Sequence, residues 1–176
     1  ILPSIKKLLL DFKDLKIIIA PRHPERADSI LTECKKNNLP AKITDENQLI
    51  NNQIKIINTF GNLEKHFFKT DVVFLGGSLI NKGGHNPIEP AINNCAIITG
   101  PNVYNWQNIY DDMIKNNACI KCDNISELEK NIRKLLYDDR LMKNMKDNAR
   151  NIAKKKFFDQ KKLFEIIEEK IGSLSC

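Results

Sequence analysis

Short apolar runs alternate with helix-like stretches along the first two thirds of the chain. The runs predict strands that are buried on both faces, because they are four or five residues long and mostly apolar. The stretches between them place apolar residues at helical spacing. We expect strands over residues 16–20, 54–57, 72–75, 96–99 and 118–121, and helices over residues 25–38, 88–94 and 106–117. This alternation predicts an α/β fold with a Rossmann-like doubly wound parallel sheet.

The last third of the chain has a helical pattern throughout. Ser126 and Glu129 have the spacing of a capping box, which predicts a helix from there to about Tyr137. Two more helices are expected over residues 141–155 and 161–171. We therefore expect residues 1–122 to form the Rossmann-like core and residues 123–176 to form a helical C-terminal extension of the same domain.

The charge of the chain narrows the choice of partners only slightly. The 176 residues carry a formal net charge of +6, and 23 of the 28 basic residues are Lys. Proteins that read nucleic acid favour Arg, because its guanidinium makes paired hydrogen bonds to bases and phosphates. We therefore expect no nucleic-acid partner. The longest apolar runs, such as residues 8–10 and 17–20, are also far too short to span a bilayer.

Five cysteines include one C-x-x-C pair, Cys119 and Cys122. A zinc site needs two more ligands, and the sequence has neither a second such pair nor histidines at ligand spacing. A redox pair of the thioredoxin type would open a helix, whereas this segment has a strand pattern. We interpret the cysteines as reduced structural thiols and expect no metal.

Three loops at the ends of expected strands concentrate special residues. They cover residues 21–26, 59–63 and 76–90. In a parallel sheet, ligands bind at the carboxyl ends of the strands, so these loops are the expected binding edge.

The third loop is the most informative. Two Gly-Gly pairs flank residues 78–82, Asn86 and Pro87 suit the start of a helix, and Glu89 falls in its first turn. Such a helix start attracts phosphate, while Glu89 could accept the hydroxyls of a ribose. The alternative is a Gly-rich turn before a capped helix, with Glu89 merely stabilising the helix dipole. The loop is neither a Walker loop nor a G-x-G-x-x-G turn.

These residues resemble a known family. The segments P-R-H-P-E-R at 21–26, G-G-S at 76–78, G-G-H-N-P-I-E-P at 83–90 and G-P at 100–101 are similar to the C-terminal half of bacterial 3-deoxy-D-manno-octulosonic acid (Kdo) transferases. That family moves Kdo from CMP-Kdo onto lipid A precursors in lipopolysaccharide synthesis. Its fold is the two-domain glycosyltransferase-B fold, in which the C-terminal domain binds the nucleotide.

The resemblance implies a set of CMP-Kdo contacts. Pro21 and Arg22 match the nucleotide-contacting pair, and Glu89 is the expected partner of the ribose diol. The segment 61–63 stands where the family commonly has Gly-Glu-Leu, so an amide replaces the acidic side chain. The full set of expected donor contacts is Pro21, Arg22, Gly61, Asn62, Leu63, Gly77, Ser78, Asn86, Pro87, Ile88 and Glu89, with His23, Lys82 and His85 as weaker candidates.

The resemblance also implies what this chain would not do alone. The general base of the family belongs to an N-terminal acceptor-binding domain with no counterpart in this sequence. We therefore expect an inverting Kdo transferase fragment that is soluble and binds CMP or CMP-Kdo, without a catalytic residue, cofactor or metal of its own. The parent enzyme would work on the cytoplasmic side of the inner membrane, at an anionic surface, and would bind the lipid A precursor through the missing domain.

Two alternatives stay open at this point. The chain could be a non-catalytic nucleotide-binding module from a split or decayed gene. It could also be the donor domain of another nucleotide-sugar glycosyltransferase, since a Gly-Gly loop followed by a glutamate recurs among such enzymes.

Overall fold

The computed structural model describes residues 1–44, 54–59, 61 and 63–174, and of residues 157–174 it describes the backbone alone. The chain folds as two units, residues 1–63 and residues 64–176. Each has its own parallel sheet and its own core. Among the described residues, no helix has the length and apolar character needed to cross a bilayer.

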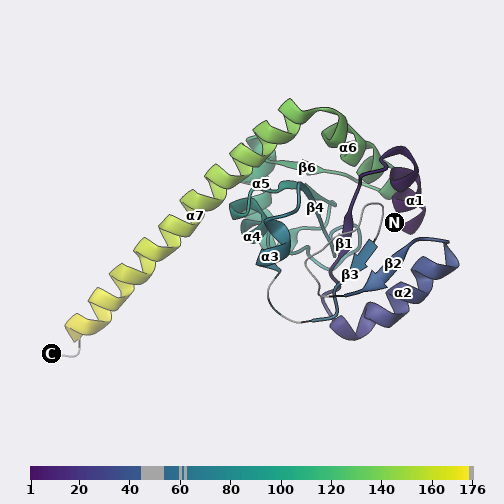
Figure 1. Ribbon diagram of the computed structural model, residues 1–176. Coiled ribbons are helices and arrows are strands. Elements are labelled where there is room, and N and C mark those ends of the chain that lie inside the picture. Colours follow the sequence, from purple (N-terminus) through teal and green to yellow (C-terminus); the bar gives the residue numbers. More distant parts are fainter. Residues whose placement is uncertain (45–53, 60, 62, 175–176) are drawn as a thin grey trace. The chain divides into compact units, whose positions relative to one another are not determined.

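The first unit is a small three-stranded α/β sandwich (Figure 1). Its parallel sheet has the order β1-β3-β2, and Ile54 of the central strand is level with Ile17 on one side and Ala41 on the other. The core packs α1 and α2 onto this sheet through Ile5, Leu9, Ala27, Cys34, Ile54 and Ile56. The elements are α1 (Leu2–Asp11), β1 (Ile17–Ile19), the 3-10 turn η1 (Pro24–Arg26), α2 (Ala27–Lys36), β2 (Ala41–Ile43) and β3 (Ile54–Ile56).

The second unit is larger and also has a three-stranded parallel sheet, in the order β4-β5-β6. Its elements are α3 (Glu64–Phe67), β4 (Val72–Leu75), α4 (Ile88–Ile92), β5 (Ala96–Thr99), the 3-10 turn η2 (Tyr104–Trp106), α5 (Gln107–Lys115), β6 (Cys119–Lys121), α6 (Ile125–Tyr137) and α7 (Asp139–Leu174).

The central strand β5 is buried on both faces, as its continuous apolar sequence predicts. Ile97 packs on one face with Tyr110 and Met113 of α5. Ala96 and Ile98 pack on the other face with Leu128 and Leu135 of α6 and Met145 of α7. Residues of α6 and α7, after residue 122, therefore contribute to the core of this unit.

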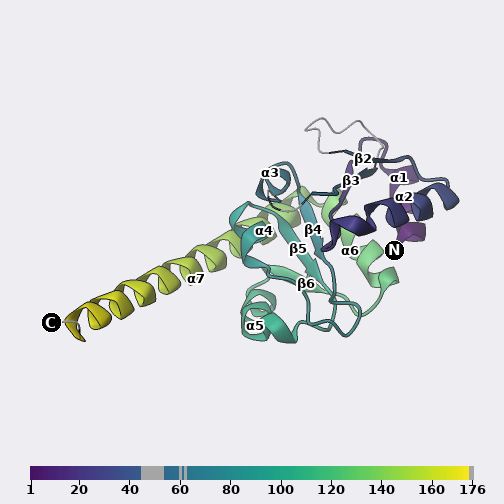
Figure 2. The same cartoon turned by 90° about the horizontal axis from the view of Figure 1, so that it is seen from below.

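Helix α7 contacts α4, α5, α6 and β5 with its N-terminal half. Ala149 and Ala153, one turn apart and fully buried, allow the close approach. Figure 2 shows the helix continuing well past α4 and α5.

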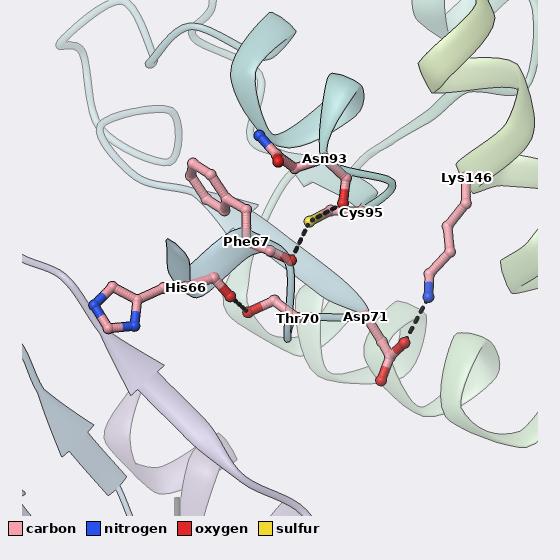
Figure 3. Close-up of polar contacts among 7 residues, drawn as sticks. All are labelled: His66, Phe67, Thr70, Asp71, Asn93, Cys95 and Lys146. Carbon is pink, nitrogen blue, oxygen red and sulfur yellow. Dashed lines mark hydrogen bonds and ion pairs between the residues drawn. The ribbon is translucent and has the colours of Figure 1, made fainter. Parts of the chain in front are cut away.

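Polar contacts also hold α7 and α3 at the start of the sheet (Figure 3). Lys146 Nζ of α7 lies 2.5 Å from Asp71 Oδ1, next to the first residue of β4. The Cys95 thiol donates to the Phe67 carbonyl at 3.5 Å, and the Thr70 hydroxyl donates to the His66 carbonyl at 2.7 Å. This end of the sheet is thus occupied by contacts within the protein, opposite the edge that carries the Gly-rich loop.

The α/β class with parallel strands is confirmed, and strands 72–75 and 96–99 lie where the sequence predicts them. Strand β2 was not expected. In the helical tail two details of the prediction were wrong. The cap of α6 is Asn124, whose Oδ1 accepts from the Glu127 N–H at 2.9 Å, so the capping box lies two residues earlier than predicted. The two helices expected after residue 140 are one continuous helix, α7.

The C-x-x-C pair is divided between the two faces of the sheet. Cys119 belongs to the cluster around Tyr110, whereas Cys122 packs with Ile98 and Leu128. Residues three positions apart in an extended chain point to opposite faces, so these thiols do not face one another. Cys122 donates to the Thr99 carbonyl at 3.2 Å. Burial raises the pKa of the Cys122 thiol to about 11.

The cysteines should therefore be inert in the folded protein. In a Cys176→Ser variant, the other four thiols should not react with a disulfide reagent at pH 8, because burial keeps Cys34, Cys95, Cys119 and Cys122 protonated and covered. All four should react once urea unfolds the chain. Prompt labelling of the native protein would contradict this and favour an accessible redox pair.

Candidate functional site

In the first unit, two of the expected loops leave one edge of the sheet. β1 and β3 are parallel neighbours in register, with Ile19 level with Ile56, so residues 21–23 and 61–63 both follow carboxyl ends. Pro21 is half-buried, while Arg22, His23, Gly61 and Leu63 are exposed. Gly61 has a φ of +78°, a backbone conformation that favours glycine. Asn62 lies outside the described residues.

In the second unit, the Gly-rich loop is held against the end of β5 through Ser78. The Ser78 hydroxyl donates to the Leu75 carbonyl at 2.5 Å and accepts from the Gly100 N–H at 2.8 Å. The Ser78 carbonyl accepts from the Asn102 N–H at 2.9 Å. Ser78 is fully buried, so its hydroxyl holds the loop in place and is not exposed to solvent.

A second set of contacts holds the middle of the loop. The Asn105 N–H donates to the Gly83 carbonyl at 3.2 Å, and the Asn105 amide donates to the Lys82 carbonyl at 3.3 Å. Gly83 has a φ of +80°, and a Cβ there would lie 2.3 Å from Asn105 Nδ2. Glycine is therefore required at this position for both reasons.

The end of the loop is held from α5. The Tyr110 hydroxyl donates to the His85 carbonyl at 2.8 Å. The half-buried His85 ring packs over the Gly76–Gly77 turn, where a Cβ added to Gly77 would lie 3.8 Å from His85 Nε2. The first and last parts of the loop thus touch one another.

The short helix α4 begins at Ile88, with Asn86 directly before Pro87. The N-cap residue is Pro87, one position after the Asn86 expected there, but Asn86 Oδ1 accepts from the Ile88 N–H at 2.9 Å. Pro87 and Pro90 have no N–H, and the Ile88 N–H is used by Asn86. This helix start therefore offers a phosphate fewer backbone donors than the sequence pattern suggests.

The expected site residues of the second unit divide into two groups by exposure. Ser78 and Pro87 are buried, and Gly77 and Ile88 are half-buried. Of the expected site residues in this unit, Lys82, Asn86 and Glu89 have exposed side chains, and so do their loop neighbours Ile80 and Asn81. One loop at the carboxyl end of β4 therefore presents a cation, an amide and a carboxylate. Among the residues whose side chains the structure describes, no cluster of His, Cys, Asp or Glu could hold a metal ion.

Sequence reasoning missed the residues that hold this loop. Asn102, Asn105 and Tyr110 lie 22 to 25 residues after their partners in the loop. The available signal was Gly100-Pro101, directly after the strand that neighbours β4.

Comparison with known proteins shows which family this chain is related to. No model of a known protein family matches the chain. The 3-deoxy-D-manno-octulosonic acid transferase of Rickettsia prowazekii is 35% identical over 167 residues, which cover 94% of this chain and 36% of the relative. The chain is a homologue of the Kdo transferases. The transferase of Haemophilus influenzae is 30% identical over 139 residues, covering 77% of this chain and 33% of the relative.

A solved structure supports the same relationship. The crystal structure of the C-terminal CMP-Kdo binding domain of WaaA from Acinetobacter baumannii matches with a TM-score of 0.80 and 28% identity, over 86% of this chain and 80% of that domain. The expected resemblance to the nucleotide-binding half of Kdo transferases is therefore confirmed. This chain spans about a third of the length of the curated Kdo transferases it matches.

The close contact between Gly100 and Ser78 should make Gly100 indispensable. A Cβ at Gly100 would lie 2.3 Å from the Ser78 carbonyl oxygen, so backbone must move on one side or the other. We expect Gly100→Ala to lower the free energy of unfolding by about 1–3 kcal/mol in urea denaturation. Gly76→Ala is the matched control, because its Cβ would meet its nearest neighbour, His85 Cδ2, at an ordinary 3.9 Å. Equal stability of the two variants would contradict the argument.

Proposed function

We propose that this chain binds CMP-Kdo and acts as the donor domain of a Kdo transferase, an inverting glycosyltransferase. The observation that carries the proposal is the structural match to a CMP-Kdo binding domain over most of both chains. The loop at the end of β4 adds to it, because that loop is built to hold exposed polar groups at a carboxyl edge, where ligands of parallel sheets bind.

Glu89 would bind the ribose. Its carboxylate is exposed in the first turn of α4 and lies next to a helix start that Asn86 fixes. A carboxylate has acceptor positions for two hydroxyl groups, which suits a ribose diol. Asn86, Pro87 and Ile88 would support this contact mainly through the backbone, since two of the three side chains are partly or fully buried.

Cations would bind the phosphate and the Kdo carboxylate. The start of α4 has few backbone donors, so Lys82 on the loop is a more effective partner for negative charge than the helix end alone. Arg22 and His23, exposed after β1, are the candidates from the first unit, with Pro21, Gly61, Asn62 and Leu63 as further contacts. Gly77 and Ser78 would shape the loop on which the donor rests.

In the proposed reaction, a hydroxyl of the acceptor attacks the anomeric carbon of Kdo while CMP leaves with the bonding electrons. The hydroxyl proton passes to a general base, and the charge that develops on the CMP phosphate is stabilised by the cations of this chain. We propose that the base and the lipid A precursor site belong to the part of the enzyme outside these 176 residues. We also propose that the enzyme works in lipopolysaccharide synthesis at the cytoplasmic face of the inner membrane.

We expect the chain to bind CMP and to prefer cytidine over uridine and adenosine nucleotides. Calorimetric titration should give a dissociation constant in the micromolar to millimolar range, about −4 to −8 kcal/mol, and weaker binding of UMP and AMP. Equal affinity for the three nucleotides would point to a different glycosyltransferase donor or to a general nucleotide module.

The second prediction concerns Glu89. Glu89→Gln should weaken CMP binding by about 1.5–3 kcal/mol, because the ribose loses a charged acceptor. Binding of 2',3'-dideoxy-CMP, which lacks the diol, should be the same for both proteins. The melting temperature should hardly change, since the side chain is exposed. Unchanged CMP affinity in the variant would remove Glu89 from the site.

A further inference from the structure

The residue that holds the end of the Gly-rich loop comes from outside every expected site segment. Tyr110 belongs to α5, and it is fully buried. Its ring packs in the core with Leu75, Ala91 and Ile97. Its hydroxyl donates a hydrogen bond to the carbonyl of His85 at 2.8 Å.

The hydroxyl is a dependable donor. Burial raises the pKa of Tyr110 above its usual value, so the hydroxyl keeps its proton at neutral pH. A phenylalanine would fill the same volume of the core without burying a polar atom. Because a buried hydroxyl without a partner would destabilise the core, this hydroxyl contributes through its hydrogen bonds, and the bond to the His85 carbonyl is the one that reaches the loop.

The His85 carbonyl stands at a sensitive point of the loop. Gly83 and Gly84 directly before it have φ values of +80° and +69°, and glycines give the backbone most freedom. Directly after it come Pro87 and Asn86, whose Oδ1 accepts from the Ile88 N–H at the start of α4. The bond from Tyr110 thus fixes the backbone between a pair of glycines and the helix start that carries Glu89.

We propose that Tyr110 is a positioning residue for the nucleotide: its hydroxyl sets the His85 backbone and, through it, the place of Glu89. This inference rests on the proposed function, because the ligand is the nucleotide named there. Tyr110 itself would not touch the ligand, since its hydroxyl points to a protein carbonyl and its ring is covered.

The matching variant is Tyr110→Phe, which removes one oxygen and keeps the ring. It should bind CMP about tenfold more weakly in calorimetry, a change of about 1.4 kcal/mol. Amide hydrogens of residues 83–89 should exchange faster in the ligand-free variant than in the wild type, because the loop has lost the hydrogen bond from Tyr110 to the His85 carbonyl.

A buried substitution that leaves the loop alone is the control. Met113 lies one turn after Tyr110 on α5, and it is also fully buried in the same cluster. Met113→Val should lower the melting temperature while leaving CMP affinity and exchange in residues 83–89 as in the wild type. If it weakens CMP as much as Tyr110→Phe does, general loss of stability explains both and the proposal is wrong.

A double-mutant cycle with Glu89→Gln separates positioning from mere stabilisation. If Tyr110 acts by placing Glu89, its removal should cost little further CMP affinity once Glu89 has been changed, so that the two effects are not additive. Additive effects would overturn the proposal.

The outcomes also separate this proposal from the proposed function. If the wild type binds CMP in the expected micromolar to millimolar range and Tyr110→Phe binds it equally well, the positioning role is overturned and the proposed function stands. If the wild type does not bind CMP, the function fails. Hydrogen exchange then decides whether Tyr110 holds the loop, and unchanged exchange in residues 83–89 overturns that as well.

Discussion

The carbonyl of Ser78 lies so close to Gly100 that not even a methyl group fits between them, and the arrangement of the site depends on this contact. It places the turn after β4 directly against the end of β5, its neighbour in the sheet. Because the two backbones touch, the Ser78 hydroxyl reaches the Gly100 N–H, and Asn102 reaches the Ser78 carbonyl. The segment after β5 then runs along the Gly-rich loop and supplies Asn105 to its middle. A glycine at one strand end thereby determines the course of a loop that begins more than twenty residues earlier.

This construction separates the groups that build the loop from those that can meet a ligand. Ser78 and Tyr110 are fully buried, and their hydroxyls are bonded to backbone. Lys82, Asn86 and Glu89 are exposed. Polar residues that look equivalent in the sequence thus have different tasks, and burial distinguishes them. The donor-contact list taken from the family resemblance contains both kinds, which is why Ser78 is better understood through the backbone it holds than through its own side chain.

Local patterns predicted the strands that form mostly apolar runs ending directly before a Gly. β4 and β5 were placed to the residue, because each is a mostly apolar run that ends directly before a Gly, although three of the four residues of β4 are only half-buried. The sequence pattern did not predict β2, because Ala41–Ile43 is only three residues long and half-exposed. The cap of α6 was placed two residues late because Ser126 and Glu129 have the right spacing but Asn124 and Glu127 have it too. The sequence also predicted that a Gly-rich loop follows β4. It could not predict Asn105 or Tyr110, since a hydrogen bond between residues more than twenty positions apart leaves no local pattern.

The hydrogen bonds that hold the loop matter for binding, because ordering a Gly-rich loop costs much conformational entropy. Gly77, Gly83 and Gly84 all have positive φ values, and glycine loses more backbone entropy than other residues when it is fixed. If the loop became ordered only when the ligand bound, the backbone entropy lost in ordering it would weaken the observed affinity. Here the contacts to Ser78, Gly83 and His85 order it within the folded protein. In the proposed site, the binding energy of Lys82 and Glu89 would then contribute fully to the affinity for the ligand. Glycines give the loop its course, and the buried donors of the neighbouring segment keep it there.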